Sequence, residues 1–407
     1  MKIRTITNAS ELATLAKTWN GLSGGVPFRS FAWLSTWWRC FGEVESGQDE
    51  SPSSTPAPRG PAAELAVAAV HDPSTFEVIA IAPWYIEHSR TQGRVMRWLG
   101  SGVVCSDYVS VLCEEDREQE VAVALADWLA SDEAPRWDAL ELSGVATEDK
   151  LLLRLIVELS GNHHKAHAHH RPGATCWRLT LPESWDDYLK LLSKTRRKRT
   201  RGIVRDWFDS GRAELLTMRR GTDLSKWLAT FEDLHQRRRQ SLGQPGCFAD
   251  PQFASFLREV ARQLFETGQF QFNQLRIDGQ PVAMDFNLLG NRVVYAYQGG
   301  VDPTALDDQP GHLITIAQLR RALNRGLVAY DFLRGDEPYK HNWRATPCEL
   351  TDYRIVPARA GARVAHAVWV TGQWSRDLAR GALRTATGLR DQALAAMKGL
   401  ARPMNAS

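Results

Sequence analysis

Three consecutive strand patterns joined by two-residue turns limit the fold of this chain more than any other feature. The strands are expected over residues 270–277, 281–289 and 292–298, with turns at Asp278-Gly279 and Gly290-Asn291. Such Gly-containing pairs form turns whose twist matches that of a β-hairpin. The pattern therefore predicts an antiparallel meander at the centre of a sheet.

A helix and a further strand follow this meander. Pro310-Gly311 precedes a helix that is expected from His312 to Gly326, and residues 327–332 are typical of an apolar strand. The start of a helix presents free backbone N–H groups and the positive end of the helix dipole, so it attracts anions. We expect Gly311, His312 and Leu313 to offer N–H groups to a phosphate, because Gly311 has no side chain in the way.

Strand and helix patterns alternate along the whole chain, which predicts an α/β (α+β) fold. The 407 residues suit two packed domains, and we expect an N-terminal half over 1–174 and a C-terminal half over 175–357. Residues 43–64 are rich in Pro, Ser and Gly and are expected to be disordered. Residues 358–407 mix apolar residues with arginines, which predicts a basic amphipathic helical tail.

The composition excludes several classes of protein. With 43% hydrophobic and 24% charged residues, the chain is typical of an ordinary globular protein. Its six cysteines form no CxxC pair and no regular framework, which argues against zinc ribbons and disulfide scaffolds and fits a reducing cytoplasm. No segment reaches the ~20 apolar residues that cross a bilayer, and the N-terminus lacks an apolar signal region, so we expect a soluble or peripheral protein.

A basic patch lies in the helix that is predicted to begin at Ser184. Its cations are Arg196, Arg197, Lys198, Arg199 and Arg201. Such a patch suits the phosphates of a nucleotide cofactor, an acidic polysaccharide or RNA, or else it forms a solvated face.

A histidine-rich tract runs from Gly161 to Cys176 and raises the question of a metal site. The spacing of His163, His167 and His169 is compatible with some of the ligands that a metal site requires. We interpret the tract as a polar link between the two halves and assign no metal.

The chain resembles a known enzyme family at several motifs. They are PFRSFAWLSTWWRCFG at residues 27–42, LGSGVVCSDYVSVL at 99–112, SKTRRKRTR at 193–201, LHQRRRQS at 234–241, PGHLI at 310–314 and YDFLRGDEPYKHNWRA at 330–345. These motifs are similar to those of GNAT-related acetyltransferases of the cellulose-biosynthesis (CelD/BcsL) type, whose relatives include the FemAB peptidyltransferases. From residue 184 to residue 344 the resemblance is nearly continuous.

This resemblance implies tandem GNAT-like acyltransferase folds, with mixed, mostly antiparallel sheets flanked by helices. It also implies acetyl-CoA or another acyl-CoA as donor, bound by the C-terminal half, with no metal. In that interpretation the pyrophosphate binds at Pro310, Gly311, His312 and Leu313. Arg334 and Lys340 then orient the acceptor or bind the CoA phosphates. The chain has PGHLI in place of the QxxGxG/A pattern that is common in GNAT enzymes.

Acyl transfer from a thioester needs a base, a donor to the thioester oxygen and an acid for the leaving thiolate. The candidate bases are Asp331, Asp336, Glu337 and His235. Backbone amides of the third meander strand are expected to contact the oxygen, and Tyr297 or Tyr295 to protonate the thiolate. The alternative interpretation is structural, with Arg334 paired to Asp336, Lys340 paired to Glu337, and both tyrosines packed on the sheet.

The expected activity is N- or O-acetyl transfer, directly from the thioester, to a saccharide of an envelope-polysaccharide precursor or to an amine, in the cytoplasm. Two alternatives stay open. One is a FemAB-like peptidyltransferase whose donor is aminoacyl-tRNA, whereas the leading interpretation has no nucleic-acid partner. The other is a catalytically degenerate scaffold that contacts a polysaccharide-synthesis complex or the inner membrane through the tail at 358–407.

Overall fold

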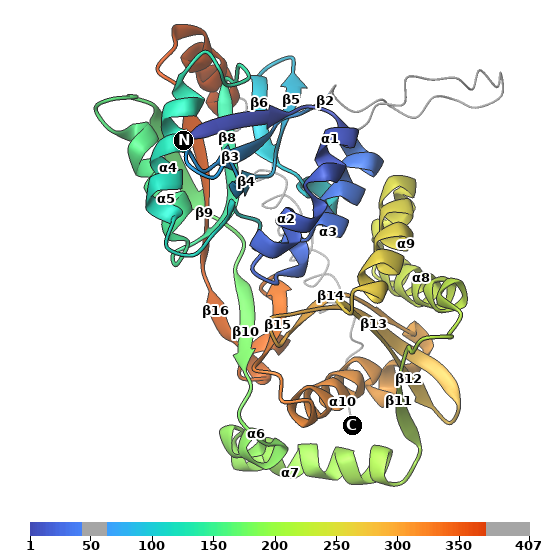
Figure 1. Ribbon diagram of the computed structural model, residues 1–407. Helices are drawn as coiled ribbons and strands as arrows, with labels where there is room; N and C mark the ends of the chain where they lie inside the picture. Colours follow the sequence, from blue (N-terminus) through green and yellow to red (C-terminus); the bar gives the residue numbers. More distant parts are fainter. Residues whose placement is uncertain (43–62, 372–407) are drawn as a thin grey trace, which may run out of the picture.

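The computed structural model describes residues 1–42 and 63–371, which form two halves packed side by side (Figure 1). The strands of the first half are β1 (Lys2–Ile6), β2 (Ala63–Leu65), β3 (Val67–His71), β4 (Val78–Ala82), β5 (Trp84–Ser89), β6 (Gly93–Trp98), β7 (Leu112–Cys113), β8 (Ala139–Ala146) and β9 (His167–Pro172). Its helices are α1 (Ala9–Thr14), α2 (Ala16–Leu22), η1 (Pro27–Arg29), α3 (Phe31–Trp37), η2 (Trp38–Gly42), η3 (Gly102–Val104), α4 (Glu118–Ala130) and α5 (Lys150–Ser160).

The second half begins at β10. Its strands are β10 (Cys176–Thr180), β11 (Ala213–Thr217), β12 (Phe270–Ile277), β13 (Gln280–Gly290), β14 (Val293–Val301), β15 (Ala329–Arg334) and β16 (Thr346–Cys348). Its helices are α6 (Trp185–Leu191), α7 (Lys194–Ile203), η4 (Val204–Asp209), α8 (Leu224–Ser241), η5 (Cys247–Ala249), α9 (Pro251–Glu266), η6 (Pro303–Asp308), α10 (Pro310–Asn324) and α11 (Tyr339–Asn342).

The predicted meander forms β12, β13 and β14, in the middle of a seven-stranded sheet with the order β11-β12-β13-β14-β15-β10-β16. Asp278 and Gly279 both have positive φ, 48° and 80°, as the predicted turn requires. Helix α10 covers one face of this sheet, and α8 and α9 cover the other (Figure 1). The central part of the second half was therefore predictable from turn chemistry and strand length.

The first half contains two sheets, with the orders β1-β3-β4-β7 and β2-β5-β6-β8-β17-β9. Strand β17 (Leu350–Val356) is the last strand along the chain, yet it pairs with β8 and β9 of the first half. The range 175–357, which we expected to form the C-terminal half, thus includes a strand that completes the sheet of the first half.

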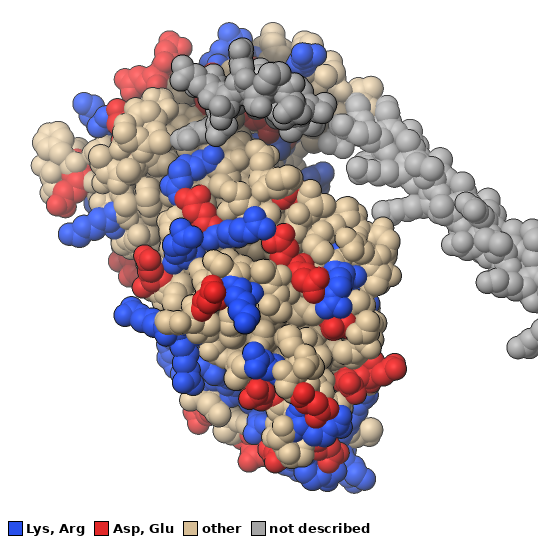
Figure 2. Space-filling view, turned by 90° about the vertical axis from the view of Figure 1, so that its right-hand side faces the viewer, with Lys and Arg blue, Asp and Glu red and all other residues tan. Residues whose placement is uncertain are grey.

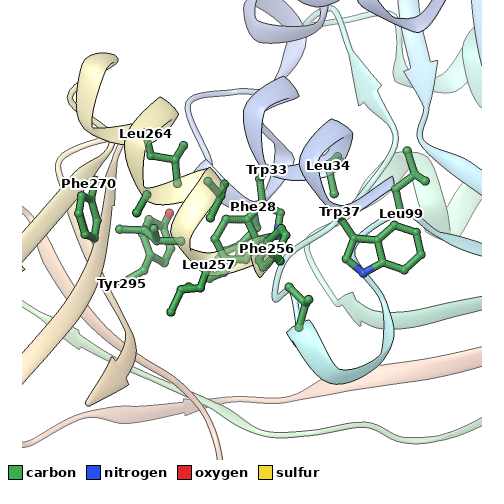
Figure 3. Close-up of a cluster of buried hydrophobic side chains, with 14 of the residues drawn as sticks. Phe28, Trp33, Leu34, Trp37, Leu99, Phe256, Leu257, Leu264, Phe270 and Tyr295 are labelled. Carbon is green, nitrogen blue, oxygen red and sulfur yellow. The ribbon is translucent and has the colours of Figure 1, made fainter. Parts of the chain in front are cut away.

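A shared hydrophobic core joins the two halves. Trp33 of α3 packs edge-on against Phe256 of α9, with ring centroids 5.0 Å apart, and Phe28 of η1 packs against Tyr295 of β14 at 5.9 Å. Figure 3 shows these side chains between the helices of both halves. Trp33, Phe28 and Phe256 are fully buried, so the halves are held together by apolar burial.

Several local predictions need correction. The helix expected from Ser184 to Gly211 is interrupted once, because Leu192 is extended and Ser193 caps a new helix, α7, by accepting the Arg196 N–H. Helix α7 then continues directly into η4. Most of the insert 43–64 lies outside the described residues, but residues 63–64 belong to β2. Residues 360–371 are helical, and the remainder of the predicted tail lies outside the described residues. Within the described ranges no helix is long and apolar enough to cross a membrane.

Candidate functional site

Strands β14 and β15 pair in parallel over a short stretch and then separate. Tyr295 opposite Asp331 is their last pair, whereas β14 remains paired with β13 as far as Val301. A register shift makes Tyr297 the extra residue of a β-bulge. Beyond Tyr295, the β15 side of β14 has no strand partner in the described part of the chain. This is the edge whose amides we predict to contact a thioester oxygen.

Helix α10 begins shortly after β14 ends, and its start differs from the prediction in one respect. The Gln309 carbonyl accepts the N–H groups of His312 (2.8 Å) and Leu313 (3.1 Å), so these two amides are already used. Pro310 has no N–H group. Gly311 is therefore the residue among these whose amide has no partner in the described part of the chain. Of the three N–H groups that we expected to bind a phosphate, one is free.

Two cations of α7 lie beside this helix start. The Arg199 guanidinium donates to Gln309 Oε1 at 3.0 Å, and Arg196 donates to the backbone carbonyl of Asn342 at 3.1 Å. Burial lowers the pKa of His312, and the charges of Arg199 and Arg196 lower it further. The start of α10 therefore lies in a positive field, which favours an anion there.

Asp331 on β15 joins the two halves of the protein. It is fully buried, and its Oδ2 accepts the Tyr108 hydroxyl at 2.7 Å and Arg178 Nε at 2.8 Å. Its Oδ1 accepts the Leu333 N–H at 2.8 Å. Burial raises the pKa of Asp331, although the Arg178 charge and the hydrogen bonds to the carboxyl act in the opposite direction. The predicted base is thus enclosed by a cation and a phenol at the point where β14 and β15 separate.

The loop after β15 also contacts the first half. Arg334 Nε donates to Asp107 Oδ1 at 2.7 Å, and its Nη2 donates to the Ser106 carbonyl at 3.2 Å. Asp107 is 2% exposed, so its charge is neutralised mainly by Arg334. The pairing of Arg334 with Asp336, considered from the sequence, is wrong: Asp336 is exposed and has no ion pair in the described residues.

Lys340 supports this loop from inside. It is 1% exposed, and its Nζ donates to the backbone carbonyls of Leu333 (3.1 Å), Arg334 (2.9 Å) and Gly335 (3.0 Å). Glu337, which is exposed, lies 3.0 Å from the same amine. An ammonium group has three N–H donors, and all three are used here. The prediction that Lys340 contacts a CoA phosphate is therefore corrected, whereas its pairing with Glu337 is confirmed.

His235 lies on α8, over the free part of β14. The ideal Cβ position of Gly300 is 2.8 Å from the His235 backbone nitrogen, so the helix and the strand are in close contact there. His235 Nδ1 lies 3.1 Å from Gln236 Oε1, and its Nε2 lies 3.6 Å from Cys247 Sγ. Burial lowers the pKa of His235, so the neutral imidazole is favoured. A neutral, oriented imidazole is suited to act as a base.

Tyr297 is close to the same region but its hydroxyl is engaged. It donates to the Val104 carbonyl of the first half at 2.7 Å, and its ring packs on Trp33 with centroids 5.1 Å apart. Burial raises the pKa of Tyr297. These contacts match the structural alternative that we considered for this tyrosine.

Asp285 is a titratable group that sequence reasoning missed. It lies on β13 opposite Gly299 and accepts a hydrogen bond from Gln318 of α10. Burial raises its pKa to about 7. The ideal Cβ position of Gly299 is 2.8 Å from Asp285 Oδ1, so only glycine leaves room for this carboxyl. The sequence did contain one indication of this group, because Asp285 is a charged residue within an otherwise largely apolar strand pattern.

The other residues that sequence reasoning missed are Asp107, Tyr108, Arg178 and Cys247. Asp107 and Tyr108 belong to the motif LGSGVVCSDYVSVL, and two of its residues other than glycine, Cys105 and Tyr108, have positive φ, 51° and 61°. A motif with two charged or phenolic residues in a turn-like segment indicates a site. Nothing in the sequence indicated which strand of the other half they would reach.

The histidine tract is arranged differently from the spacing considered above. His163 and His164 lie near Asp127 of α4, with one potential ligand atom from each residue within 4.8 Å of the others. The His169 ring instead packs at a tilt against the His366 ring, with centroids 4.2 Å apart. His163, His167 and His169 therefore do not gather around one point in the described structure.

Comparisons with known proteins agree with this architecture. Residues 194–341 match the family described as acetyltransferase (GNAT) domain. The whole fold is similar to the crystal structure of FemX, with a TM-score of 0.57, 12% identity and coverage of 87% of this chain and 97% of FemX. It is also similar to the C-terminal domain of a putative lysylphosphatidylglycerol synthetase from Agrobacterium fabrum (TM-score 0.50, 8% identity, coverage 89% and 96%). No curated protein sequence matches the chain.

These findings confirm the predicted fold class and enzyme class. The described structure is a mixed α/β protein with two halves, whose sheets are mostly antiparallel and flanked by helices. The matched domain contains β11 to β15, α10 and most of the loop that Lys340 supports. Residues 194–341 of the second half match a GNAT acetyltransferase domain, which supports the expected enzyme class, an acyltransferase.

Proposed function

We propose that the protein transfers an acyl group from acyl-CoA to an amine or a hydroxyl group of a saccharide, such as an envelope-polysaccharide precursor. The observation that carries the proposal is the start of α10. This helix start forms an anion-binding subsite directly beyond the point where β14 and β15 separate. Its parts are the free Gly311 amide, the positive end of the helix dipole and the nearby Arg196 and Arg199.

The separated strands suit the rest of the donor. A thioester chain that enters between β14 and β15 meets free backbone groups beyond Tyr295, which are suited to donate to the thioester oxygen. His235 faces the same part of β14 and takes the proton of the attacking amine or hydroxyl group. Asp331 and its partners Tyr108 and Arg178 hold the first half against this edge.

The acceptor class follows from the sequence resemblance to acetyltransferases of the cellulose-biosynthesis type. We also propose a cytoplasmic location, because CoA thioesters are intracellular donors. The helix at residues 360–371 leads into the part of the chain through which we propose contact with a membrane or a synthesis complex.

A second candidate donor is aminoacyl-tRNA, favoured by the surface of α7. Lys194 and Lys198 are exposed and form no ion pair within the described residues. By contrast, acidic and basic side chains are interspersed on the face that carries α8 and α9 (Figure 2). The likeness to FemX supports this donor at the level of the fold. Binding of RNA through α7 would weaken steeply with increasing salt concentration.

Thermal unfolding with acetyl-CoA tests the proposal through two substitutions of one residue. Gly311 has an ordinary backbone conformation, and an added Cβ would lie 3.8 Å from Val301 Cγ2, so Gly311→Ala should fold normally. Gly311→Glu places a carboxylate in the anion-binding subsite, where it would repel the phosphates of the donor. We expect acetyl-CoA at about 100 times its dissociation constant to stabilise the wild type by about 2.7 kcal/mol. Gly311→Ala should retain most of this shift and Gly311→Glu should lose it.

The result also separates the alternatives. An equal shift in Gly311→Glu and wild type would place the donor elsewhere. No shift with acyl-CoA, together with salt-sensitive tRNA binding that is lost in Lys194→Glu/Lys198→Glu, would favour aminoacyl-tRNA. A normal shift with no transfer to any amine or saccharide tested would favour the scaffold.

A further inference from the structure

A cysteine, a histidine and a glutamine form an ordered constellation on one side of β14. Cys247 Sγ lies 3.6 Å from His235 Nε2, and His235 Nδ1 lies 3.1 Å from Gln236 Oε1. Gln236 Nε2 donates to the Pro245 carbonyl at 2.9 Å, which identifies Oε1 as the acceptor. The His235 proton therefore resides on Nδ1, and the lone pair of Nε2 faces the thiol.

The loop that carries Cys247 is shaped to fit this arrangement. Gly246 has a φ of 74°, and a Cβ there would lie 2.1 Å from Gln236 Oε1, so the loop packs directly on α8. Arg239 Nη1 holds the same loop through Gln244 Oε1 at 3.0 Å. Gln236 thus orients the imidazole and fixes the loop of the thiol at the same time. A nucleophile, a base and a group that orients the base are the parts of a catalytic triad.

The surroundings of the sulfur have opposing effects on its ionisation. Burial raises the pKa of the Cys247 thiol to about 12, while the N–H groups of Cys247 and Phe248 and the Arg239 charge lower it. At rest the thiol is therefore protonated and needs a base to become a nucleophile. The neutral His235 at 3.6 Å is that base, and the two N–H groups near the sulfur are donors for a developing oxyanion.

The constellation lies where an acyl donor would present its thioester. His235 is packed on Gly300, five residues beyond the last pair of β14 with β15. Cys247 and Cys105 are both close enough to Tyr297, the bulge residue, to raise the pKa of its phenol. The unpaired part of β14 thus lies between the thiol and the anion-binding subsite at the start of α10.

We propose that Cys247 is a catalytic nucleophile and that the acyl group passes through a thioester on its sulfur before it reaches the acceptor. This inference rests on the proposed acyl-CoA donor and replaces direct transfer, which we expected from the sequence. His235 acts as the base in both steps, and Gln236 is a positioning residue.

The two steps balance as follows. In the first step Cys247 gives its proton to His235 Nε2, the sulfur attacks the acyl carbon, and the bond from that carbon to the CoA sulfur breaks. His235 then protonates the CoA thiolate. In the second step His235 takes the proton of the acceptor, which attacks the Cys247 thioester, and the departing Cys247 thiolate recovers that proton. The sum is acyl transfer from CoA to the acceptor.

Acylation of the full chain by acetyl-CoA without acceptor tests this proposal. After an acid quench we expect a mass gain of one acetyl group, located on Cys247 by peptide mapping and removed by neutral hydroxylamine, as a thioester is. Chromatography should show a burst of about one equivalent of free CoA. Cys105→Ser is the matched control, because Cys105 is exposed and also lies near Tyr297.

The variants give results that decide the question. Cys105→Ser should acylate normally, whereas Cys247→Ala should lose the burst and slow transfer by at least about 100-fold. Its thermal shift with acetyl-CoA should remain, which shows that the donor still binds. Cys247→Ser is the second variant if the alanine protein is unstable. Stabilisation of wild type by acetyl-CoA without acylation, or transfer at the wild-type rate by Cys247→Ala, would overturn the inference alone. Absence of stabilisation would overturn the proposed donor as well.

Discussion

Both halves of the protein contain a parallel pair of strands that is connected through a helix. The two units differ in the residues at the start of that helix. In the first half β6 and β8 pair at Val95–Ala139 and Met96–Leu140, and α4 lies between them in sequence. In the second half β14 and β15 pair in the same sense, and α10 lies between them. The topology is shared, so any difference in function must come from side chains and loops.

The starts of the two helices differ in charge. Helix α4 begins after Arg117 with Glu118 and Glu120 in its first turn, and Arg117 is paired with Asp72 and Glu120. Carboxylates already satisfy the positive end of that helix. Helix α10 begins with Pro-Gly and no acidic residue in its first turn. Among the described residues, the start of α10 is therefore better suited than the start of α4 to the anionic donor that we propose.

The first half contributes to the site in another way. The long segment between β6 and α4 reaches across to the second half, where Tyr108 binds Asp331 and Asp107 binds Arg334. The segment that would surround a donor in the first half therefore supports the donor edge of the second. In the proposed function, the second half binds the donor and the first half encloses the donor site.

The largest expected loss of stability comes from a change of Lys340. This residue has no counterpart in the first half, which has no buried lysine in the described residues. We expect Lys340→Met to reduce the free energy of unfolding by about 3–5 kcal/mol, since three backbone carbonyls lose their donor inside the protein. Urea unfolding measures this. Glu337→Gln is the control: it removes an exposed partner and should cost less than about 0.5 kcal/mol. Equal costs for both variants would show that the ion pair, rather than the carbonyl contacts, holds the loop.

The next effect concerns pH and two aspartates, one in each half. The pKa of Asp285 is raised to about 7 from its usual 3.8, so the folded state binds the proton more tightly than the unfolded chain. Its contribution to stability is complete below pH 4 and is lost as the pH rises through 7, with a slope that approaches about 1.4 kcal/mol per pH unit. Asp285→Asn keeps the acceptor for Gln318 and should flatten the stability profile between pH 5 and 8.

Asp72 in the first half provides the control. Hydrogen bonds from Ser74, Arg117 and the Thr75 N–H hold the pKa of this carboxyl well below its usual range. Its contribution is therefore present at neutral pH and is lost only as the pH falls below about 4. Asp72→Asn should leave the slope between pH 5 and 8 unchanged. A profile of Asp285→Asn with the wild-type slope would contradict a neutral Asp285 carboxyl in the folded protein.

Much of the second half was predictable from local sequence. The strand over 270–277 was predicted with its observed bounds, and α10 was expected two residues later than it begins. Two-residue turns, Pro-Gly at a helix start and apolar runs of strand length are signals within a few residues. The position of Asp331 at the end of the parallel pair followed from the same local order.

The rest depended on contacts between distant parts of the chain. The sequence pattern of β17 does not indicate that this strand pairs with the first half, because a strand has the same periodicity in either sheet. Lys340 appeared to be a surface cation, since its burial depends on three carbonyls that converge only in the folded loop. Cys247 was one of six scattered cysteines until α8 and the loop before η5 brought it to His235.

The smallest of these effects would test the comparison of the two helix starts directly. We expect Arg199→Glu to weaken acetyl-CoA binding about tenfold at low salt, because it reverses a charge beside Gly311 that is exposed and partly screened. Arg205→Glu changes the net charge equally, at an exposed site already paired with Asp206, and should change affinity less than about twofold. Glu118→Gln at α4 should likewise have no effect. If removal of that carboxylate instead created a second site for acetyl-CoA, the first half would have kept its donor geometry and lost only its charge.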